Sequence, residues 1–369
     1  MLDLPEVTLF VPGYRGSFLV TSEQKRAWLT VGEALLRGDR SLALPFDGQR
    51  PEKNFGTLLP DGPLTGFTVV PLIAAVDVYA RWMEFGAAQL PGFTAFAYDW
   101  RQDIRASARQ LCGLIEALAA ARRGRLQVNI VAHSMGGLVA LHCLRYGTGP
   151  DSGLPTWAGA RYVRKVVFVG TPFRGSPGIF QDLLKGTVTG RNTALMSVPA
   201  LFSFTSSFQL LPPEDDVLFA QPPAQATRVL EPGSWWSFGW GVFSDADLHD
   251  NEAYRAQQRR QLAAHAELWR SLGDAPGPLP GFQTLVVTGV GHAVKSGFPE
   301  ANGAVDFRRP TFGDGDGTVL AKRAVPPQPL QFEQKTSRAD HGTLLKDASV
   351  QEAILQFLKG ARRPAETPR

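Results

Sequence analysis

Short apolar runs alternate along this chain with stretches in which apolar residues recur every three or four positions. The runs are rich in β-branched side chains, which is typical of strands buried in a parallel sheet. We predict strands over Val7–Val11, Leu126–Ala132, Val163–Val169 and Thr284–Val290, and helices over Ile104–Arg122 and Leu138–Tyr146. Strands and helices alternating at this spacing predict right-handed crossovers, and therefore an α/β fold with a mostly parallel, doubly wound sheet.

Weaker patterns extend this framework. We predict helices over Glu23–Arg37, Leu72–Phe85, Asn251–Leu272 and Ser349–Leu358, and a short strand over Thr94–Tyr98. The helix over Asn251–Leu272 is polar along most of its length, whereas the helix over Ser349–Leu358 is amphipathic. These patterns are compatible with further layers around the same sheet.

The character of the sequence changes at about Pro177 and returns at about Pro280. Between these points the chain is rich in Phe, Trp, Ser and Pro. We therefore expect a first half of the α/β core over residues 1–176, an aromatic cap insertion over 177–280, the second half of the core over 281–361 and a tail over 362–369. The aromatic residues are expected to form an apolar cap, although some must serve as its own core.

Composition narrows the function classes. The 369 residues carry a formal net charge of +4, and the basic residues are scattered in twos and threes with no recognised nucleic-acid module, so no nucleic-acid partner is expected. Cys112 and Cys143 are too few for a disulfide framework, and we interpret both as free cysteines buried in helices. The sequence as given has no signal-peptide pattern and no long uncharged apolar run, from which we expect a cytoplasmic location.

The first candidate for chemistry is Ala132-His133-Ser134-Met135-Gly136, which lies between a predicted strand and a predicted helix. It matches the nucleophile elbow G-x-S-x-G with Ala in place of the first Gly. Small residues suit this sharp turn, which exposes the Ser134 hydroxyl and aims a helix N-terminus at a developing oxyanion. We expect Ser134 to be a nucleophile.

A serine nucleophile needs a base, which in this fold comes late in the chain. Of six histidines, only His292 and His341 fall in loops after the sheet resumes. His341 lies shortly before the last helix, whereas His292 precedes the candidate acid loop, so we favour His341 over His292.

The acid is expected in the glycine-rich loop Gly313–Val319, which offers Asp314 and Asp316. We favour Asp316, which precedes Gly317-Thr318-Val319. A calcium loop would need a glycine and a glutamate where Val319 and Val325 stand, so that interpretation fails on spacing.

The remaining site features follow from the same fold. A second oxyanion donor should come from a loop beside the elbow, and we expect the backbone N–H of Tyr14, after Pro12-Gly13, to act with that of Met135. The sequence has no H-E-x-x-H, C-x-x-C or phosphate-binding glycine motif. We therefore expect no metal and no cofactor.

Taken together, these residues resemble the lecithin:cholesterol acyltransferase family, which includes the phospholipid:diacylglycerol acyltransferases. The shared motifs run in family order: Val11-Pro12-Gly13, Tyr98-Asp99-Trp100-Arg101, His133-Ser134-Met135-Gly136-Gly137, Gly170-Thr171-Pro172, Leu210-Leu211-Pro212, Gly289-Val290-Gly291 and Gly313-Asp314-Gly315-Asp316-Gly317-Thr318-Val319. Tyr-Asp-Trp-Arg is the most specific of them. The resemblance implies an α/β-hydrolase fold with a cap, with Ser134, Asp316 and Tyr14 at matching motif positions and His341 matched by its place before the last helix.

Several functions are compatible with this pattern. We expect a serine esterase, lipase or O-acyltransferase that acts on a lipid acyl ester through an acyl-enzyme, with peripheral contact to a membrane or lipid surface left open. An esterase or thioesterase on a soluble substrate uses the same residues. A non-catalytic lipid-binding or partner-binding protein of the same fold is the alternative from another class. The sequence does not decide between hydrolysis and acyl transfer.

Overall fold

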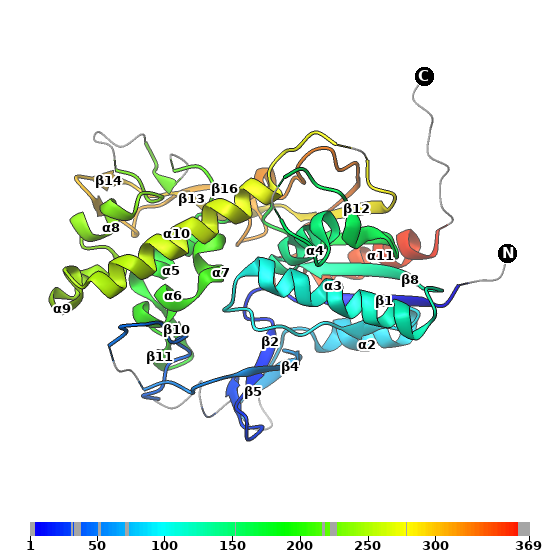
Figure 1. Cartoon of the computed structure of the whole chain (residues 1–369), viewed down its shortest axis with the longest axis horizontal. Coiled ribbons are helices and arrows are strands. Elements are labelled where there is room, and N and C mark those ends of the chain that lie inside the picture. Colours follow the sequence, from blue (N-terminus) through cyan, green and yellow to red (C-terminus); the bar gives the residue numbers. More distant parts are fainter. Residues whose placement is uncertain are drawn as a thin grey trace.

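The computed structural model describes residues 4–30, 32, 38–50, 53–70, 74–151, 153–215, 218–221, 227–277 and 279–360. Its centre is a six-stranded sheet in which every neighbouring pair is parallel. In sheet order the strands are β17 (Glu333–Ser337), β12 (Gln283–Gly289), β9 (Val163–Val169), β8 (Gln127–His133), β1 (Glu6–Val11) and β7 (Thr94–Ala95). The parallel doubly wound sheet predicted from the sequence is confirmed (Figure 1).

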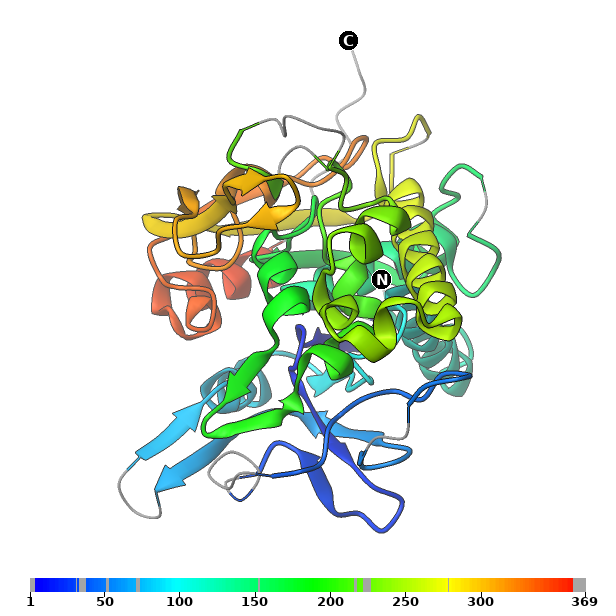
Figure 2. The same cartoon turned by 90° about the vertical axis from the view of Figure 1, so that its left-hand side faces the viewer.

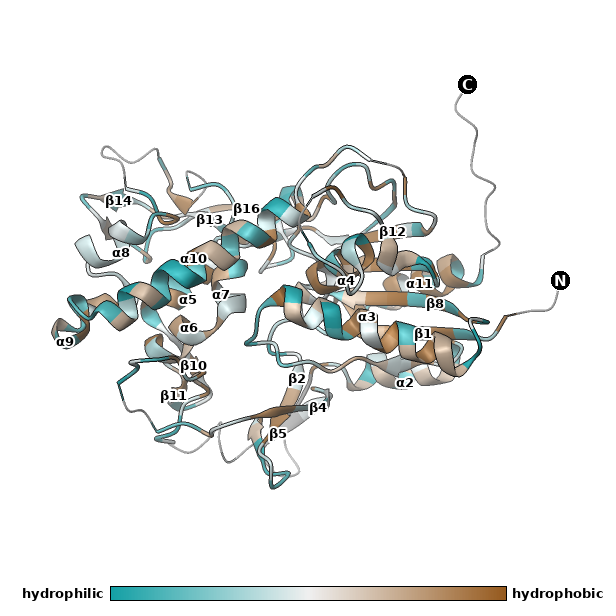
Figure 3. Cartoon of the chain, in the orientation of Figure 1, coloured by the Kyte–Doolittle hydropathy of each residue, from teal (hydrophilic) through white to brown (hydrophobic). Residues whose placement is uncertain are grey.

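Alternate residues of the central strands enter two separate apolar clusters, one on each face of the sheet. In β8, Ile130 belongs to the apolar cluster on one face of the sheet, and the next residue, Val131, belongs to the cluster on the opposite face. The first face is covered by α3 (Ile104–Ala121) and α4 (Met135–Tyr146), and the second by α2 (Ala80–Gln89) and α11 (Ala348–Lys359). Figure 3 shows the resulting apolar ribbon along β1 and β8. Burial on both faces explains why these strands read as continuous apolar runs.

The order of the strands creates a switch point between β1 and β8. The chain leaves β1 toward β7 on one side and returns to β8 on the other. Val11 pairs with Ala132 in the register of these two strands, so their following loops begin side by side. In an open α/β sheet such a switch point is where ligands bind. The loop after β1 and the turn after β8 are therefore the expected walls of a site.

A second region packs beside the sheet and is built mainly of short helices. Its elements are α5 (Gly178–Lys185), β10 (Thr187–Thr189), β11 (Asn192–Met196), α6 (Val198–Ser203), α7 (Thr205–Gln209), α8 (Pro232–Ser237), α9 (Ala246–His249) and α10 (Glu252–Leu272). Figure 2 shows these helices in green to yellow-green, in front of the sheet. The aromatic side chains Phe202, Phe204, Phe208, Trp235, Trp240 and Phe243 are all buried within it. These six side chains therefore belong to the core of this region, which is the role expected for some of the aromatic residues.

Two buried side chains of α4 donate hydrogen bonds to the C-terminal end of α10. Arg145 donates hydrogen bonds to the carbonyls of Ser271 (2.7 Å) and Gly273 (2.8 Å), and Tyr146 Oη donates to the Ser271 carbonyl (3.0 Å). Because the last carbonyls of a helix have no intrahelical donors, a cation at this end also favours the helix dipole. The helix of the second region and the helix that follows Ser134 are thereby joined.

Several short strands lie outside the central sheet. They form antiparallel pairs or triplets: β2 (Ser17–Val20), β3 (Arg26–Trp28) and β4 (Leu59–Pro63); β5 (Gly66–Val70) and β6 (Ala74–Asp77); β13 (His292–Gly297) and β16 (Thr311–Gly315); β14 (Glu300–Ala301) and β15 (Ala304–Val305). The sequence analysis predicted none of these pairs. Figure 2 shows β2 to β6 in blue and cyan, below the helices of the second region.

Some predicted elements need correction. The helix predicted over Glu23–Arg37 is wrong where it overlaps strand β3, and residues 31 and 33–37 lie outside the described residues. The helix predicted over Leu72–Phe85 is wrong at its start, because residues 74–77 form β6 and the helix begins at Ala80. In both places residues that read as a helical period pair with a neighbouring strand, and tertiary contacts override the local pattern. The strand predicted over Thr94–Tyr98 is shorter, and the tail over 362–369 lies outside the described residues.

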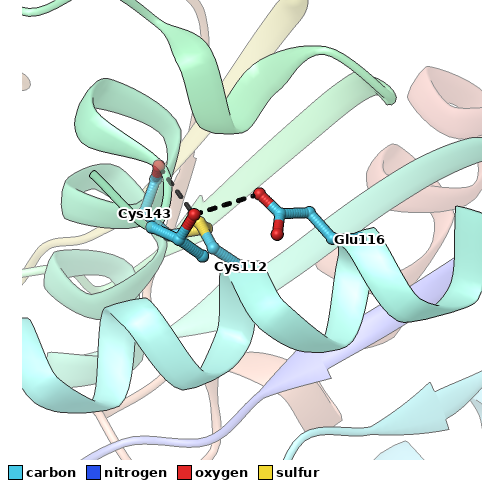
Figure 4. Close-up of a disulfide and its surroundings, with 4 residues drawn as sticks. Cys112, Glu116 and Cys143 are labelled. Carbon is cyan, nitrogen blue, oxygen red and sulfur yellow. Dashed lines mark hydrogen bonds between the residues drawn. A yellow bond between two sulfur atoms is a disulfide. The ribbon is translucent and has the colours of Figure 1, made fainter.

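The interpretation of both cysteines as free thiols is wrong. Cys112 of α3 and Cys143 of α4 form a disulfide, with Cα atoms 5.7 Å apart (Figure 4). Both residues are buried, as the sequence predicted, but the packing of α3 against α4 brings them together. The pairing depends on how two helices cross, which the sequence spacing does not reveal.

Candidate active site

Ser134 occupies a strained turn between β8 and α4. Its backbone adopts φ 55° and ψ −129°, and helix α4 begins at the next residue, Met135. A positive φ at a non-glycine residue costs about 1–3 kcal/mol and persists only where the surrounding structure enforces it. Here the Ser134 N–H is held by the Val169 carbonyl (2.8 Å), and the turn leaves Ser134 half-buried at the carboxyl end of β8. This is the geometry that the elbow motif predicts.

Glycine is required where α4 approaches the loop after β1. A Cβ on Gly136 would overlap the carbonyl oxygens of Val11 and Pro12. The first turn of α4 can therefore lie directly against this loop, which explains the small residue after Met135.

His341 connects Ser134 with Asp316. Its Nδ1 lies 2.7 Å from Asp316 Oδ2 and its Nε2 lies 2.8 Å from Ser134 Oγ. Because a carboxylate only accepts, Nδ1–H donates to Asp316, which leaves Nε2 to accept the Ser134 hydroxyl. The structure brings together, in one hydrogen-bonded series, the three residues that the sequence analysis favoured.

Asp316 is buried, and four donors surround it. Its Oδ1 accepts the backbone N–H groups of Thr318 (2.9 Å) and Val319 (2.6 Å), and its Oδ2 accepts His341 Nδ1–H. Its own carbonyl accepts the His341 N–H (2.8 Å), which fixes the loop that carries the imidazole. Burial alone would raise the pKa of Asp316, but the hydrogen bond and charge of His341 and the two backbone donors outweigh it and hold that pKa below its usual value.

The two alternative residues are placed elsewhere. His292 Nε2 donates to the Arg338 carbonyl (2.7 Å), and Asp314 Oδ1 accepts the Gly291 N–H (2.7 Å). Both lie in the hairpin of β13 and β16 beside the acid loop. Neither has a hydrogen bond to Ser134 or His341 within the described part of the chain.

The predicted oxyanion donors flank Ser134. Met135 is the first residue of α4, so its N–H has no acceptor within the helix. Tyr14 follows Gly13, whose backbone lies against Ser134: a Cβ on Gly13 would be 3.3 Å from Ser134 Oγ. Among the described residues, no acceptor within the protein takes the backbone N–H of Tyr14 or Met135. Both donors are therefore available to a bound group.

Side chains of the same loop reach the second region. Tyr14 Oη lies 2.8 Å from Ser207 Oγ of α7, and Arg15 lies 3.6 Å from Asp182 of α5. Burial raises the pKa of Asp182, an effect that Arg15 and then Lys295 partly offset. The sequence analysis missed these contacts, because the partners are separated by more than 150 residues and neither carries a motif.

No metal site is evident within the described residues, where no group of three or more His, Cys, Asp or Glu side chains converges. In the same residues no helix combines the length and the apolar character needed to cross a membrane.

Comparison with known proteins agrees with the sequence analysis. Residues 76–232 match the model of the family described as Lecithin:cholesterol acyltransferase, which confirms the predicted resemblance. The chain is 28% identical over 212 residues to the uncharacterized protein YJR098C of Saccharomyces cerevisiae, and 38% identical over 104 residues to phospholipase A(1) LCAT3 of Arabidopsis thaliana. The alignments cover 57% and 27% of this chain but 29% and 21% of those proteins, so it spans less than a third of either relative.

A solved structure resembles the whole chain. The crystal structure of the Tle4-Tli4 complex matches with a TM-score of 0.56 at 14% identity, covering 96% of this chain and 98% of the other. At this identity the likeness concerns the fold alone. Together with the parallel sheet and its strand–turn–helix at Ser134, it confirms the predicted α/β-hydrolase fold.

Proposed function

We propose that this chain, whose residues 76–232 match the lecithin:cholesterol acyltransferase family model, is a serine-dependent lipid acyl-ester hydrolase or O-acyltransferase. The observation that carries the proposal is the hydrogen-bonded series from Ser134 Oγ through His341 to Asp316. A serine hydroxyl is a weak nucleophile until a neighbouring base takes its proton, and His341 Nε2 is in position to do so.

The first half of the reaction forms an acyl-enzyme. Ser134 Oγ attacks the ester carbonyl while His341 Nε2 takes the hydroxyl proton. The negative charge that develops on the carbonyl oxygen is stabilised by the N–H groups of Met135 and Tyr14. When this intermediate collapses, the bond to the alcohol breaks, His341 gives its proton to the departing oxygen, and the acyl group stays on Ser134.

The second half reverses these roles. Water or an acceptor alcohol loses a proton to His341 and attacks the acyl carbonyl, and the proton then returns to Ser134 Oγ as the acyl bond breaks. Water yields a fatty acid and an alcohol yields a new ester. The two outcomes differ only in which hydroxyl enters the closed site, so one set of residues serves both.

Asp316 acts by orientation and charge. It holds His341 in the tautomer whose Nε2 is free to accept, and it stabilises the imidazolium formed after proton transfer. Its lowered pKa keeps it ionised at neutral pH, as this role requires.

We further propose that residues 177–280 cap the site. The hydrogen bond between Tyr14 and Ser207 and the ion pair between Arg15 and Asp182 support this assignment, because both join the second region to the loop that carries an oxyanion donor. A lipid acyl chain needs concave apolar surface near the reacting carbon, which a cap can complete.

Turnover by a Ser134→Ala variant tests the proposal. Purified protein is assayed with phosphatidylcholine vesicles and a p-nitrophenyl acyl ester, each with and without an added alcohol, and the products are separated. We expect at least a thousandfold loss of turnover in Ser134→Ala. The exposed Ser22→Ala serves as the matched control and should keep wild-type activity.

The products distinguish hydrolysis from acyl transfer, and two further results would contradict the proposal. Fatty acid alone indicates hydrolysis, and a new ester with the added alcohol indicates transfer. Turnover of the p-nitrophenyl ester without turnover of vesicles favours a soluble ester as substrate. Equal turnover by wild type and Ser134→Ala, or lipid binding without any turnover, would refute the proposal in favour of another site or a binding protein.

A further inference from the structure

The residue before Ser134 belongs to a second hydrogen-bonded series. His133 Nδ1 lies 2.7 Å from Tyr79 Oη, and His133 Nε2 lies 3.0 Å from the backbone oxygen of His341. Tyr79 Oη in turn accepts the backbone N–H of Gly13 at 3.1 Å. One continuous series therefore links the loop of the expected oxyanion donor with the loop of the expected base.

The direction of each bond follows from the groups involved. The His341 carbonyl only accepts, so His133 Nε2 carries a proton and donates it. The Tyr79 oxygen accepts from Gly13 and has its own proton to give, which His133 Nδ1 accepts if the imidazole is neutral. With His133 neutral, every donor in the series has an acceptor. Protonation at Nδ1 would leave the Tyr79 hydroxyl proton without one.

The surroundings favour this neutral state. His133 and Tyr79 are 6% and 5% exposed, and the imidazole rings of His133 and His341 lie 4.8 Å apart. Burial, followed by the neighbouring His341, lowers the pKa of His133 to about 3. Burial also raises the pKa of Tyr79 well above its usual value, so its hydroxyl keeps its proton. A neutral His133 does not oppose the positive charge that His341 takes up during proton transfer.

We propose that Tyr79 and His133 are positioning residues that hold the base loop and the oxyanion loop in fixed relation to Ser134. This inference rests on the proposed function and deepens it, since it concerns how the same site is kept in working geometry. In the part of the chain that the structure describes, neither side chain hydrogen-bonds to Ser134 Oγ, so both are positioning residues and not catalytic ones.

The two ends of the series hold backbone groups of both loops. At one end, the backbone of His341 is fixed on both sides: its N–H by the Asp316 carbonyl and its oxygen by His133. At the other end, Gly13 precedes Tyr14, so fixing the Gly13 N–H orients the next peptide, whose N–H is the expected oxyanion donor. Misplacement of a reacting group by about 1 Å can cost a hundredfold in rate.

The sequence analysis did not find this pair. From the sequence, His133 is identifiable only as part of the elbow, and Tyr79 lies in the middle of the helix predicted over Leu72–Phe85. In the structure Tyr79 is the N-cap residue of α2, a position that places it beneath the loop after β1.

The first test removes one hydroxyl. Tyr79→Phe should lower kcat on an ester about tenfold to a hundredfold, with KM changed less than threefold, because ground-state binding does not use this series. Tyr146→Phe is the matched control: its buried hydroxyl donates to the Ser271 carbonyl away from the site, and it should keep wild-type kcat. A kcat for Tyr79→Phe within twofold of wild type, with a fall in Tm like that of Tyr146→Phe, would overturn the proposal.

A second pair of variants separates positioning from packing. In His133→Gln the amide Nε2 can still donate toward the His341 carbonyl, whereas His133→Leu retains no donor. We expect the kcat of His133→Gln to be at least tenfold higher than the kcat of His133→Leu. Equal activity of the two folded variants contradicts the proposed role of the donor.

A measurement without turnover distinguishes this inference from the proposed function. In protein labelled with ¹⁵N-histidine, the ring nitrogens of His133 should report a neutral imidazole with its proton on Nε2 at pH 7, assigned by comparison with His133→Gln. A charged ring, or a proton on Nδ1, refutes the series even in an active enzyme. If Ser134→Ala shows the proposed function to be wrong while His133 has this tautomer, only the catalytic purpose of the series is lost.

Discussion

Gly13 lies directly against Ser134: a Cβ placed on Gly13 would come within 2.8 Å of the Ser134 Cβ and 3.3 Å of the His133 carbonyl oxygen. This approach is made by two segments that are distant in sequence and adjacent in the sheet, because β1 and β8 pair in parallel and end at the same level. The loop after β1 can therefore lie this close to Ser134 because Gly13 has no Cβ.

A methyl group at this position should displace the oxyanion loop. We expect Gly13→Ala to lower kcat about a hundredfold while the protein stays folded, because the loop must move away from Ser134. Gly113→Ala is the control, since beyond its own helix no atom of the described residues lies within 4 Å of its Cβ position in α3. It should leave kcat unchanged and stabilise the helix by about 1 kcal/mol. Unchanged kcat in Gly13→Ala would argue against this loop as an oxyanion donor.

The acid can be assigned by a matched pair of substitutions. Asp316→Asn keeps the size of the side chain but no longer fixes the His341 tautomer, so kcat should fall about 10³- to 10⁴-fold. Asp314→Asn alters the neighbouring carboxylate, which accepts the Gly291 N–H, and should retain kcat within threefold. Steady-state kinetics on one ester measures both. The reverse pattern would move the acid to Asp314.

Folding stability should fall as the pH drops below about 6.5. Burial lowers the pKa of His265 to about 4, although its bonds to the Pro212 and Leu211 carbonyls work against this shift. In the unfolded chain His265 has the ordinary histidine pKa of about 6.5. Between this pKa and the lowered pKa of the folded protein, the unfolded chain takes up a proton that the folded chain does not, so unfolding becomes more favourable as pH falls.

The size of this effect can be measured with one variant. His265 should contribute about 1–2 kcal/mol to the loss of unfolding free energy between pH 6.5 and pH 5. His265→Gln cannot take up the proton, so urea unfolding at the two pH values should show a smaller difference than in wild type. An equal difference in both proteins would contradict the lowered pKa of His265.

The disulfide between Cys112 and Cys143 should stabilise the fold without serving the chemistry. It closes a loop of 31 residues between α3 and α4, for which loss of the cross-link costs about 3–4 kcal/mol. A double variant, Cys112→Ser with Cys143→Ser, should unfold at lower urea concentration and keep wild-type kcat at temperatures where it is folded. Dithiothreitol should lower the stability of wild type and leave the double variant unchanged. An equal response of both proteins would argue against the bond.

The sequence predicted those features that depend on local pattern. The strand before Ser134 is apolar on both faces and the elbow needs small residues, so Ser134 could be predicted as a nucleophile from its immediate neighbours. His341 could be favoured over His292 from chain order, and Asp316 over Asp314 from its place before Gly317-Thr318-Val319. The structure places both within hydrogen-bonding distance of the expected partners.

Features that depend on packing were missed. Residues 26–28 and 74–77 read as parts of helices but pair as strands with β2 and β5, the strands that directly precede them in the chain. The disulfide needs the crossing of α3 and α4, and the bond between Tyr79 and His133 joins residues 54 positions apart. None of these pairings has a local period or motif from which it could be inferred.

Labelling with a fluorophosphonate, followed by peptide mass spectrometry, tests the central claim most directly, because this reagent reacts with an activated serine and requires no knowledge of the substrate. The account predicts a single adduct on Ser134 that is lost in His341→Ala. An adduct on a different serine, or no adduct on folded wild-type protein under conditions that label a known serine esterase, would contradict the proposed nucleophile and its base.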